Sequence, residues 1–263
     1  MQVLTSNHSL YTASDPQGDL SKGTGSENYE RLRPSYPRDA VSWLLRGTVP
    51  DARVADVGSG TGKLTAALLE RGLEVVAVDP APEMLEQLTK RLTQARTRVG
   101  SGEDTGLAER SVEAAFFGQS WHWVDPVVGA AELDRILVPG GAVGMLWNDL
   151  DVRVDWVAEL AAIWHTLDGA KAVDAATRQL DLGPAFTHFE SCTVDWVDIM
   201  TTEDLADLGT TRSYYLEAPA DEQEMIRQRT TELLATHFPH VRPVEVPYRT
   251  RCYRVRHVTP ALL

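Results

Sequence analysis

The chain has 263 residues, a formal net charge of −13 and two cysteines. This length suffices for one α/β domain with a sizeable core and a small cap. The acidic balance leaves no basic stripe of the kind that nucleic acids require, so we expect no nucleic-acid partner. Cys192 and Cys252 lie far apart in the sequence, which predicts neither a disulfide framework nor a thiolate metal site.

Residues 1–27 are rich in Ser, Thr, Gly, Asn and Asp, and we interpret them as a flexible N-terminal arm. No apolar run approaches about 18 residues, and the N-terminus lacks the basic-then-apolar order of a secretory signal. We therefore expect a cytoplasmic protein with no membrane segment. Residues 28–263 are expected to form a single domain, with cap elements from about 28–45 and 150–240.

Hydrophobic periodicity predicts strands that alternate with helices up to residue 147. Such alternation is typical of an α/β fold with a doubly wound, mostly parallel sheet. Pro139-Gly140-Gly141 predicts a turn before the fifth strand. The expected helices cover 38–45, 63–71, 82–92 and a segment that ends near 137, and the expected strands cover 53–57, 74–78, 98–99, 114–117 and 142–147.

The pattern changes after Asn148, where we expect a helical cap and the strands that complete the sheet. An amphipathic helix is predicted over 156–167 and a sixth strand over 189–199. Thr201-x-x-Asp204 is typical of a capping box that opens a helix. A long helix is predicted over 221–238, with Met225, Ile226, Leu233 and Leu234 on its apolar face, and a last strand over 244–258.

The segment Val54-Ala55-Asp56-Val57-Gly58-Ser59-Gly60-Thr61-Gly62 joins a short apolar run to three alternating glycines. The apolar run is typical of a buried parallel strand. Glycines let the backbone turn sharply and approach a ligand without a Cβ in the way. A strand, a glycine loop and a helix N-terminus in this order predict a nucleotide-binding site.

The glycine spacing decides which nucleotide is expected. The dinucleotide fingerprint is G-x-G-x-x-G, whereas the chain has G-x-G-x-G, so an NAD-dependent oxidoreductase is disfavoured. A phosphate-binding loop that ends at Gly62-Lys63 would need Gly where the chain has Val57, and Ser or Thr where it has Leu64. An ATP or GTP site of this kind is therefore not expected. The remaining pattern, D-x-G-x-G-x-G, resembles the first motif of class I S-adenosylmethionine-dependent methyltransferases.

A second apolar run ends in Asp79-Pro80, and Asp79 follows Gly62 by 17 residues. This is close to the spacing of roughly 20 residues expected for an acid that accepts both ribose hydroxyls. Met84 lies in the next predicted helix. The resemblance implies that Met84 packs on the adenine ring, and the alternative is that it belongs only to the core.

Further motifs extend the resemblance over roughly residues 28–258. Residues 29–37 read YERLRPSYP, which is similar to the Y-x-R-x-R-P-x-Y-P entry of a subgroup that includes trans-aconitate methyltransferase-like enzymes. Residues 119–125 read QSWHWVD, which is similar to its Q-x-x-H-W-x-D signature, and residues 211–214 and 248–253 continue the likeness. The resemblance implies S-adenosyl-L-methionine as cofactor, held by Tyr29, Asp56, Gly58, Ser59, Gly60, Gly62, Asp79, Pro80, Met84, Ser101, Gly102, Glu103 and Gln119.

The loop at residues 99–103 departs from the family pattern, which often has Asp at position 101 and Ala at position 102. Ser101 can still hydrogen-bond the adenine amine, although it is a weaker acceptor than a carboxylate. Glu103 can substitute for it. The contact to adenine is therefore open between these two side chains.

Methyl transfer from a sulfonium is an SN2 displacement with an activated leaving group, so the protein must align and desolvate the nucleophile. A carboxylate acceptor needs no base, whereas a phenol, amine or hydroxyl needs one. His122 is the candidate base or direct substrate contact, with Asp125 to orient it. The alternative is that His122 only packs between Trp121 and Trp123.

We expect aromatic side chains to line the pocket for the methyl acceptor and basic side chains to bind the acceptor. Trp121, Trp123 and Trp147 are candidate walls, because aromatic faces attract onium groups, and their alternative is ordinary core. Arg212, Tyr214 and Arg251 are candidates for binding an acidic substrate. The remaining histidines show no metal-ligand spacing, so no metal is expected.

These patterns predict an enzyme that transfers a methyl group from S-adenosylmethionine to a small molecule, with oxygen of a carboxylate or hydroxyl as the favoured acceptor. One alternative is N- or C-methylation of a secondary metabolite. Another is a cofactor-binding protein of this fold that is repurposed for chemistry other than methylation. The acceptor and the oligomeric state are left open.

Overall fold

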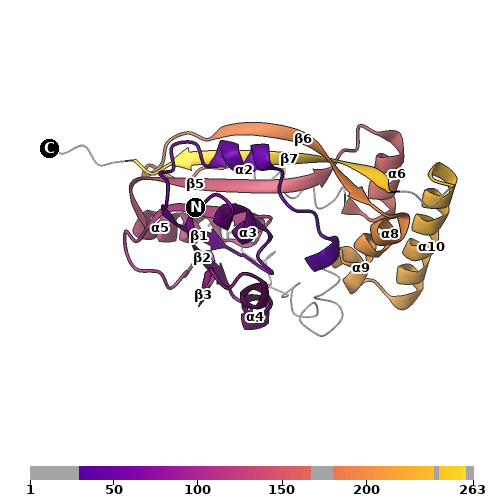
Figure 1. Ribbon diagram of the computed structural model, residues 1–263, viewed down its shortest axis with the longest axis horizontal. Coiled ribbons are helices and arrows are strands. Elements are labelled where there is room, and N and C mark those ends of the chain that lie inside the picture. Colours follow the sequence, from indigo (N-terminus) through magenta and orange to yellow (C-terminus); the bar gives the residue numbers. More distant parts are fainter. Residues whose placement is uncertain (1–29, 167–179, 240–242, 259–263) are drawn as a thin grey trace, which may run out of the picture.

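The computed structural model describes residues 30–166, 180–239 and 243–258, so the arm expected at residues 1–27 and the cofactor candidate Tyr29 lie outside the described residues. The strands are β1 (Arg53–Val57), β2 (Glu74–Asp79), β3 (Arg96–Val99), β4 (Val112–Gly118), β5 (Leu137–Leu150), β6 (Glu190–Met200) and β7 (Val244–Arg256). They form one seven-stranded sheet in the order β3-β2-β1-β4-β5-β7-β6 (Figure 1).

Most pairs in the sheet are parallel. β1 pairs in parallel with β2 and β4, and the outward pairs β2–β3 and β4–β5 are parallel as well. β7 is antiparallel to both β5 and β6. The strand order reverses direction at β1, which confirms the predicted doubly wound, mostly parallel α/β fold and places the switch point beside the glycine loop.

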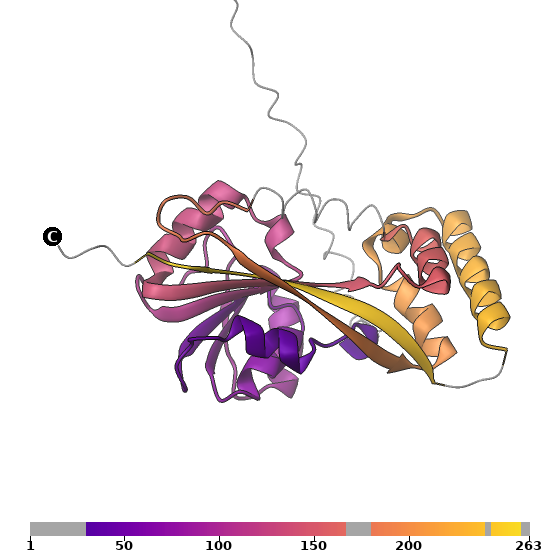
Figure 2. The same ribbon diagram turned by 90° about the horizontal axis from the view of Figure 1, so that it is seen from above.

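Helices cover both faces of this sheet (Figure 2). α2 (Arg38–Leu44), α3 (Lys63–Leu69) and α4 (Pro82–Arg91) lie on one face, and α5 (Pro126–Ile136) lies on the other. The face under α5 packs Leu133 and Ile136 against strand residues of β1, β4 and β5. Phe116 of β4 faces the opposite layer, where it packs with α2 and α3. Since side chains alternate along a strand, each central strand supplies apolar residues to both layers.

A helical cap forms the other end of the molecule, as predicted. It consists of α6 (Asp155–Ile163), α8 (Thr202–Thr210), α9 (Ser213–Glu217) and α10 (Ala220–His237), carried on the far ends of β5, β6 and β7 (Figures 1 and 2). The cap has its own apolar core, in which Leu150, Met200 and Val246 of the strands meet Leu205 and Leu234 of the helices. No helix among the described residues is long and apolar enough to cross a bilayer.

Three local predictions in this region have a clear outcome. Thr201 caps α8 as expected, since its hydroxyl oxygen accepts the Asp204 N–H at 3.0 Å. Met225 is wrong as a member of the apolar face of α10, because 52% of it is exposed, whereas Ile226, Leu233 and Leu234 are buried. The helix predicted over 156–167 ends at Ile163 as α6, and residue 167 lies outside the described part.

The turn expected at Pro139-Gly140-Gly141 is wrong, because these residues lie inside β5. The sheet absorbs them as a bulge: Leu137 pairs with Val112, and Ala142 already pairs with Ala114. Gly140 has φ 79°, the left-handed conformation that such an irregularity requires. β5 is therefore longer at both ends than the predicted 142–147, and its carboxyl end reaches the cap.

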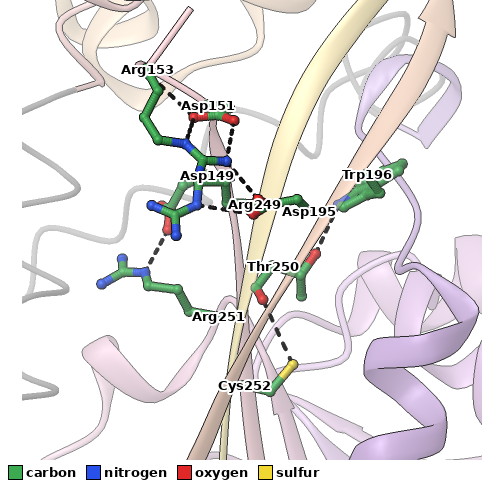
Figure 3. Close-up of polar contacts among 9 residues, drawn as sticks. All are labelled: Asp149, Asp151, Arg153, Asp195, Trp196, Arg249, Thr250, Arg251 and Cys252. Atoms are coloured by element: carbon green, nitrogen blue, oxygen red, sulfur yellow. Dashed lines mark hydrogen bonds and ion pairs between the residues drawn. The ribbon is translucent and has the colours of Figure 1, made fainter.

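Ion pairs link the projecting parts of β6 and β7 to the residues that follow β5 (Figure 3). The Arg153 guanidinium makes two bonds to Asp151 and a third to Asp195, which also pairs with Arg249. Asp195 is half exposed, so each of its pairs contributes little on its own. The sheet itself, rather than these ion pairs, keeps the projecting strands together.

A series of buried hydrogen bonds also links β5, β7 and β6. The Thr250 hydroxyl donates to Asn148 Oδ1 at 2.7 Å and accepts from the Trp196 indole at 2.8 Å. Thr250 is fully buried, so both partners depend on it for a hydrogen bond.

We predict that Thr250→Val lowers the free energy of unfolding by about 1–3 kcal/mol, because it keeps the shape of the side chain and leaves two polar groups unsatisfied. Urea unfolding of the purified protein measures the change. The exposed Thr193 of β6 provides the matched control, and Thr193→Val should change stability by less than about 0.5 kcal/mol. Equal effects of the two substitutions would contradict the role of Thr250.

Candidate functional site

The glycine loop joins β1 to α3 at the switch point of the sheet. Gly58, Gly60 and Gly62 have φ values of 70°, 52° and 91°, all in the left-handed region that favours glycine. A Cβ at Gly58 would lie 2.4 Å from the Cβ of Ser120, whereas a Cβ at Gly60 would meet nothing within 4 Å. The open side of the loop is therefore at Gly60, where a ligand can approach the backbone closely.

Two buried carboxylates lie beside the loop. Asp79, at the end of β2, accepts the Gly60 N–H at 2.7 Å and the Ala81 N–H at 2.9 Å. Asp56, at the end of β1, accepts the Thr65 hydroxyl at 2.6 Å through Oδ2. Burial, together with repulsion from Asp79, raises the pKa of Asp56 to about 7. A cationic group bound here would favour the ionised carboxylates.

The second oxygen of Asp56 supplies a test of the expected cofactor. Asp56 Oδ1 is buried and has no hydrogen-bond partner among the described residues. Buried acceptors without a partner are rare in folded proteins and point to a missing ligand or water. A cofactor with a sulfonium, an ammonium group and a ribose diol offers both positive charge and donors, so the residues present fit S-adenosylmethionine.

The loop after β3 is fastened to the loop after β4. The Ser101 hydroxyl oxygen accepts the N–H groups of Glu103 and Asp104 at 3.2 and 3.3 Å, and Glu103 Oε1 accepts the Asp125 N–H at 2.8 Å. A Cβ at Gly102 would lie 2.4 Å from Val124 Cγ2. This contact is a physical reason for Gly rather than Ala at position 102.

Gln119 occupies a strained position at the carboxyl end of β4. Its φ is 60°, which is uncommon for a residue other than glycine. The Gln119 N–H donates to Leu146 O at 2.9 Å and its Nε2 donates to Asn148 O at 3.1 Å. The following Ser120 hydroxyl donates to Val57 O at 2.6 Å. These bonds hold the strained turn between the ends of β1 and β5, and such strain is concentrated at functional sites.

His122 is oriented by a tryptophan. The Trp147 indole N–H donates to His122 Nδ1 at 3.2 Å, so the neutral ring carries its proton on Nε2. Burial lowers the pKa of His122 to about 4, which keeps the ring neutral at physiological pH. The orienting role predicted for Asp125 is wrong: its carboxylate accepts the N–H groups of Val127 and Val128 and caps α5.

The three candidate tryptophans lie in different surroundings. Trp147 is buried on β5 next to His122. Trp123 is 53% exposed, and its ring centroid lies 4.7 Å from that of His122. Trp121 is buried edge-on against Phe117 at 4.9 Å, inside the core. The structure thus brings Trp147 and Trp123 to His122 and places Trp121 among ordinary core residues.

Arg212 and Tyr214 lie in the cap, away from the glycine loop in sequence and fold. The Arg212 guanidinium lies 5.6 Å from the ring centroid of Trp164. Tyr214 stacks on His165 with centroids 4.1 Å apart, and its hydroxyl donates to Glu222 at 2.6 Å. Both candidates are therefore held by aromatic and hydrogen-bonding contacts within the cap.

Tyr248 begins residues 248–253, one of the segments that carried the resemblance, and no role for it is predicted from the sequence. Its side chain is buried on β7, and its hydroxyl has no hydrogen-bond partner within the described ranges. Burial and the nearby negative charge of Asp198 raise its pKa, while the positive charges of Arg212 and Arg33 act in the opposite direction. Tyr248 therefore lies where cap, β7 and the N-terminal segment meet.

The N-terminal segment is also bound to the glycine loop, a contact that the sequence did not reveal. Glu30 accepts the Thr61 hydroxyl and forms ion pairs with Arg91 at 2.5 Å and Lys63 at 3.4 Å. Three residues later, Arg33 donates to Thr211 O of the cap at 2.7 Å. The segment thus bridges the glycine loop and the cap across the candidate site.

No metal is expected from the sequence. In the part of the chain that the structure describes, no three His, Cys, Asp or Glu side chains are placed together to bind one.

The remaining cofactor candidates lie around the glycine loop. Pro80 is exposed at the rim beside Asp79, and Met84 is buried on α4. Ser59 is buried in the loop, with its N–H bonded to Val78 O at 3.0 Å.

Comparison with known proteins gives a consistent assignment. A family model described as a methyltransferase domain matches residues 55–145, which include the glycine loop and Asp79. An uncharacterized methyltransferase of Mycobacterium tuberculosis is 42% identical over 92% of this chain and 98% of its own length. A malonyl-[acyl-carrier protein] O-methyltransferase of Serratia marcescens is 30% identical over 58% of this chain and 61% of its own length.

The fold agrees with the sequence relatives. A structure described as a type II methyltransferase from Anaeromyxobacter dehalogenans superposes with a TM-score of 0.66 and 24% identity, over 87% of this chain and 99% of its own. The glycine loop at the switch point, the acid at the end of β2 and the near full-length relative lead to one family. The chain belongs to the class I S-adenosylmethionine-dependent methyltransferases.

Proposed function

We propose that this methyltransferase O-methylates a small organic acid, with the acceptor carboxylate held by His122 and by the guanidinium groups of Arg33 and Arg212. The observation that carries the proposal is the hydrogen bond from Trp147 to His122 Nδ1. It leaves Nε2 of the neutral ring as a donor rather than a proton acceptor. A donor suits an acceptor that arrives ionised and needs no base, and a carboxylate meets that description.

The cofactor is proposed to lie across the open side of Gly60. Asp79 would accept the ribose hydroxyls, and the orphaned oxygen of Asp56 would face the positive part of the cofactor. Bound S-adenosylmethionine supplies an activated methyl group on a sulfonium. The remaining contacts are proposed to come from the glycine loop, the rim of β2 and α4 and the two neighbouring loops, that is from Gly58, Ser59, Gly62, Pro80, Met84, Ser101, Gly102, Glu103 and Gln119.

The chain's own contribution is to place and desolvate the acceptor. Trp147 donates to His122 Nδ1 and the Trp123 ring lies beside the imidazole, so the two tryptophans fix the direction in which Nε2–H points. Arg212 and Arg33 bring two positive charges to this region and Asp198 brings one negative charge. Guanidinium groups are good partners for a carboxylate, which supports an anionic acceptor.

Two other functions remain as alternatives to this proposal. N-methylation would need a base to deprotonate the acceptor, and C-methylation would need an electron-rich carbon in the acceptor. A neutral His122 that acts as a donor favours neither reaction. Chemistry other than methylation would use the cofactor without consuming it. The similarity to a malonyl-[acyl-carrier protein] O-methyltransferase covers only part of the chain and is consistent with methylation of an acid.

The cofactor assignment predicts the effect of Asp79→Ala. Removing a carboxylate that accepts hydrogen bonds from the ligand should raise the Kd for S-adenosylmethionine at least about tenfold. Isothermal titration calorimetry measures the affinity. Glu86→Ala is the matched control, since Glu86 is an exposed acid on α4 and should bind normally. Unchanged affinity of a folded Asp79→Ala protein would refute the assignment.

If His122 acts as a hydrogen-bond donor, two substitutions of it should differ in their effect on activity. His122→Gln retains an N–H at a comparable reach, whereas His122→Ala removes it, so the alanine variant should lose about 100-fold in kcat and the glutamine variant less than about tenfold. At saturating S-adenosylmethionine, whose positive charge favours the ionised Asp56, kcat should also stay flat between about pH 6 and pH 8, because the pKa of His122 is about 4. If His122 were the general base, both substitutions would lose activity alike.

Supplying the enzyme with S-adenosylmethionine and parallel sets of small carboxylic acids, phenols and amines tests the acceptor class. We expect methyl esters of acids, detected by mass and by their hydrolysis in base. Arg212→Gln should raise the KM for the acid at least about tenfold and leave cofactor affinity unchanged. Arg227→Gln, an exposed arginine of α10, is the control. Methyl groups found only on nitrogen or carbon would overturn the proposal.

A further inference from the structure

The two cysteines, distant in sequence, are directly opposite each other in the fold. Cys192 of β6 and Cys252 of β7 are Cα partners in the antiparallel ladder. Opposite residues in such a ladder have Cα atoms about 4.5–5.5 Å apart, within the range of about 4.4–6.8 Å that a disulfide spans. Both thiols are free and interact with each other. The register therefore brings the two thiols within reach of each other, and a bond between them needs only a small local adjustment of the two strands.

One of the pair is accessible. Cys252 is fully buried, whereas Cys192 is half-buried and lines a surface cavity of about 370 Å³. The wall of this cavity also includes Trp43 and Arg46. Arg254, whose guanidinium lies 5.2 Å from the ring centroid of Trp43, adds a second positive charge near Cys192.

We infer that Cys192 and Cys252 form an oxidation site, in which a small anionic disulfide reacts first at Cys192 and Cys252 then completes a cross-strand disulfide. The Cys192 thiolate attacks one sulfur of the reagent and releases one thiol. Cys252 then attacks Cys192 Sγ, the mixed disulfide breaks and the second thiol leaves. One reagent disulfide is thus reduced to two thiols, and the protein loses two hydrogens.

The order of the two steps follows from their surroundings. Burial raises the pKa of both thiols, and the positive charges of Arg46 and Arg254 oppose this rise at Cys192. Cys192 is therefore the better first nucleophile. Glu190 pairs with Arg254, and Asp39 lies in the cavity wall, so the cavity also carries negative charge.

The bond would have a structural consequence. The chain between the two cysteines contains α8, α9 and α10, so a disulfide would tie together the two strands from which most of the cap is suspended. Closing so long a loop restricts the unfolded chain and stabilises the fold. We expect the oxidised protein to melt about 5 °C or more above the reduced protein.

Incubation of the full chain with excess oxidised glutathione at pH 8.5 tests the inference. Intact mass should fall by two hydrogens, neither cysteine should be alkylated after denaturation, and dithiothreitol should reverse both changes and the rise in Tm. Cys252→Ser should accumulate a glutathione adduct on Cys192, and Cys192→Ser should resist modification. Both variants should be checked for a native melting transition under reducing conditions.

A control variant tests whether the disulfide requires a thiol directly opposite Cys252 or only an exposed thiol on β6. In the double variant Cys192→Ser with Thr193→Cys, the thiol moves one residue along β6 and to the opposite face. It should take up glutathione without forming an internal disulfide. Two alkylatable thiols in the treated wild-type protein, or a glutathione adduct that persists on Cys192, would overturn the inference.

Discussion

The pairing of β5 with β7 is the interaction on which the rest of the molecule depends. It runs from Ala142 opposite Arg256 to Leu150 opposite Tyr248, whereas the pairing of β4 with β5 ends at Gly118 opposite Leu146. Because the antiparallel partners satisfy each other's backbone groups, these strands can project beyond the core. The cap at their ends is thereby attached beyond the edge where α/β sheets bind ligands.

The charged side chains differ between the glycine loop and the cap. Buried Asp56 and Asp79 surround the open side of the glycine loop, which favours a cation. Near the cap, the guanidinium groups of Arg212 and Arg33 and the carboxylate of Asp198 act on the buried Tyr248 hydroxyl. In the proposed function, the cationic methyl donor lies beside the two aspartates and the anionic acceptor is bound by the two arginines. His122 lies in the short 3-10 helix Trp121–Trp123 that follows β4, and its ring stays neutral because burial lowers its pKa.

Asn148 connects the parts that must meet at the site. Its Nδ2 donates to Ser35 O of the N-terminal segment at 3.0 Å, its Oδ1 accepts from Thr250, and its carbonyl accepts from Gln119. Three segments distant in sequence thus share one buried amide residue. Fully satisfied polar networks of this kind favour one arrangement over others, because a shifted segment leaves buried groups without partners.

The sequence by itself determined the alternating elements, the glycine loop and Asp79, because these follow from local periodicity and from the backbone needs of glycine. It did not reveal the bulge at Pro139, which depends on pairing with β4, or the capping role of Asp125. Partners such as Trp147 for His122, and Cys252 for Cys192, depend on strand register. Only the tertiary structure decided these contacts, because register is set by long-range pairing and burial, which no local pattern specifies.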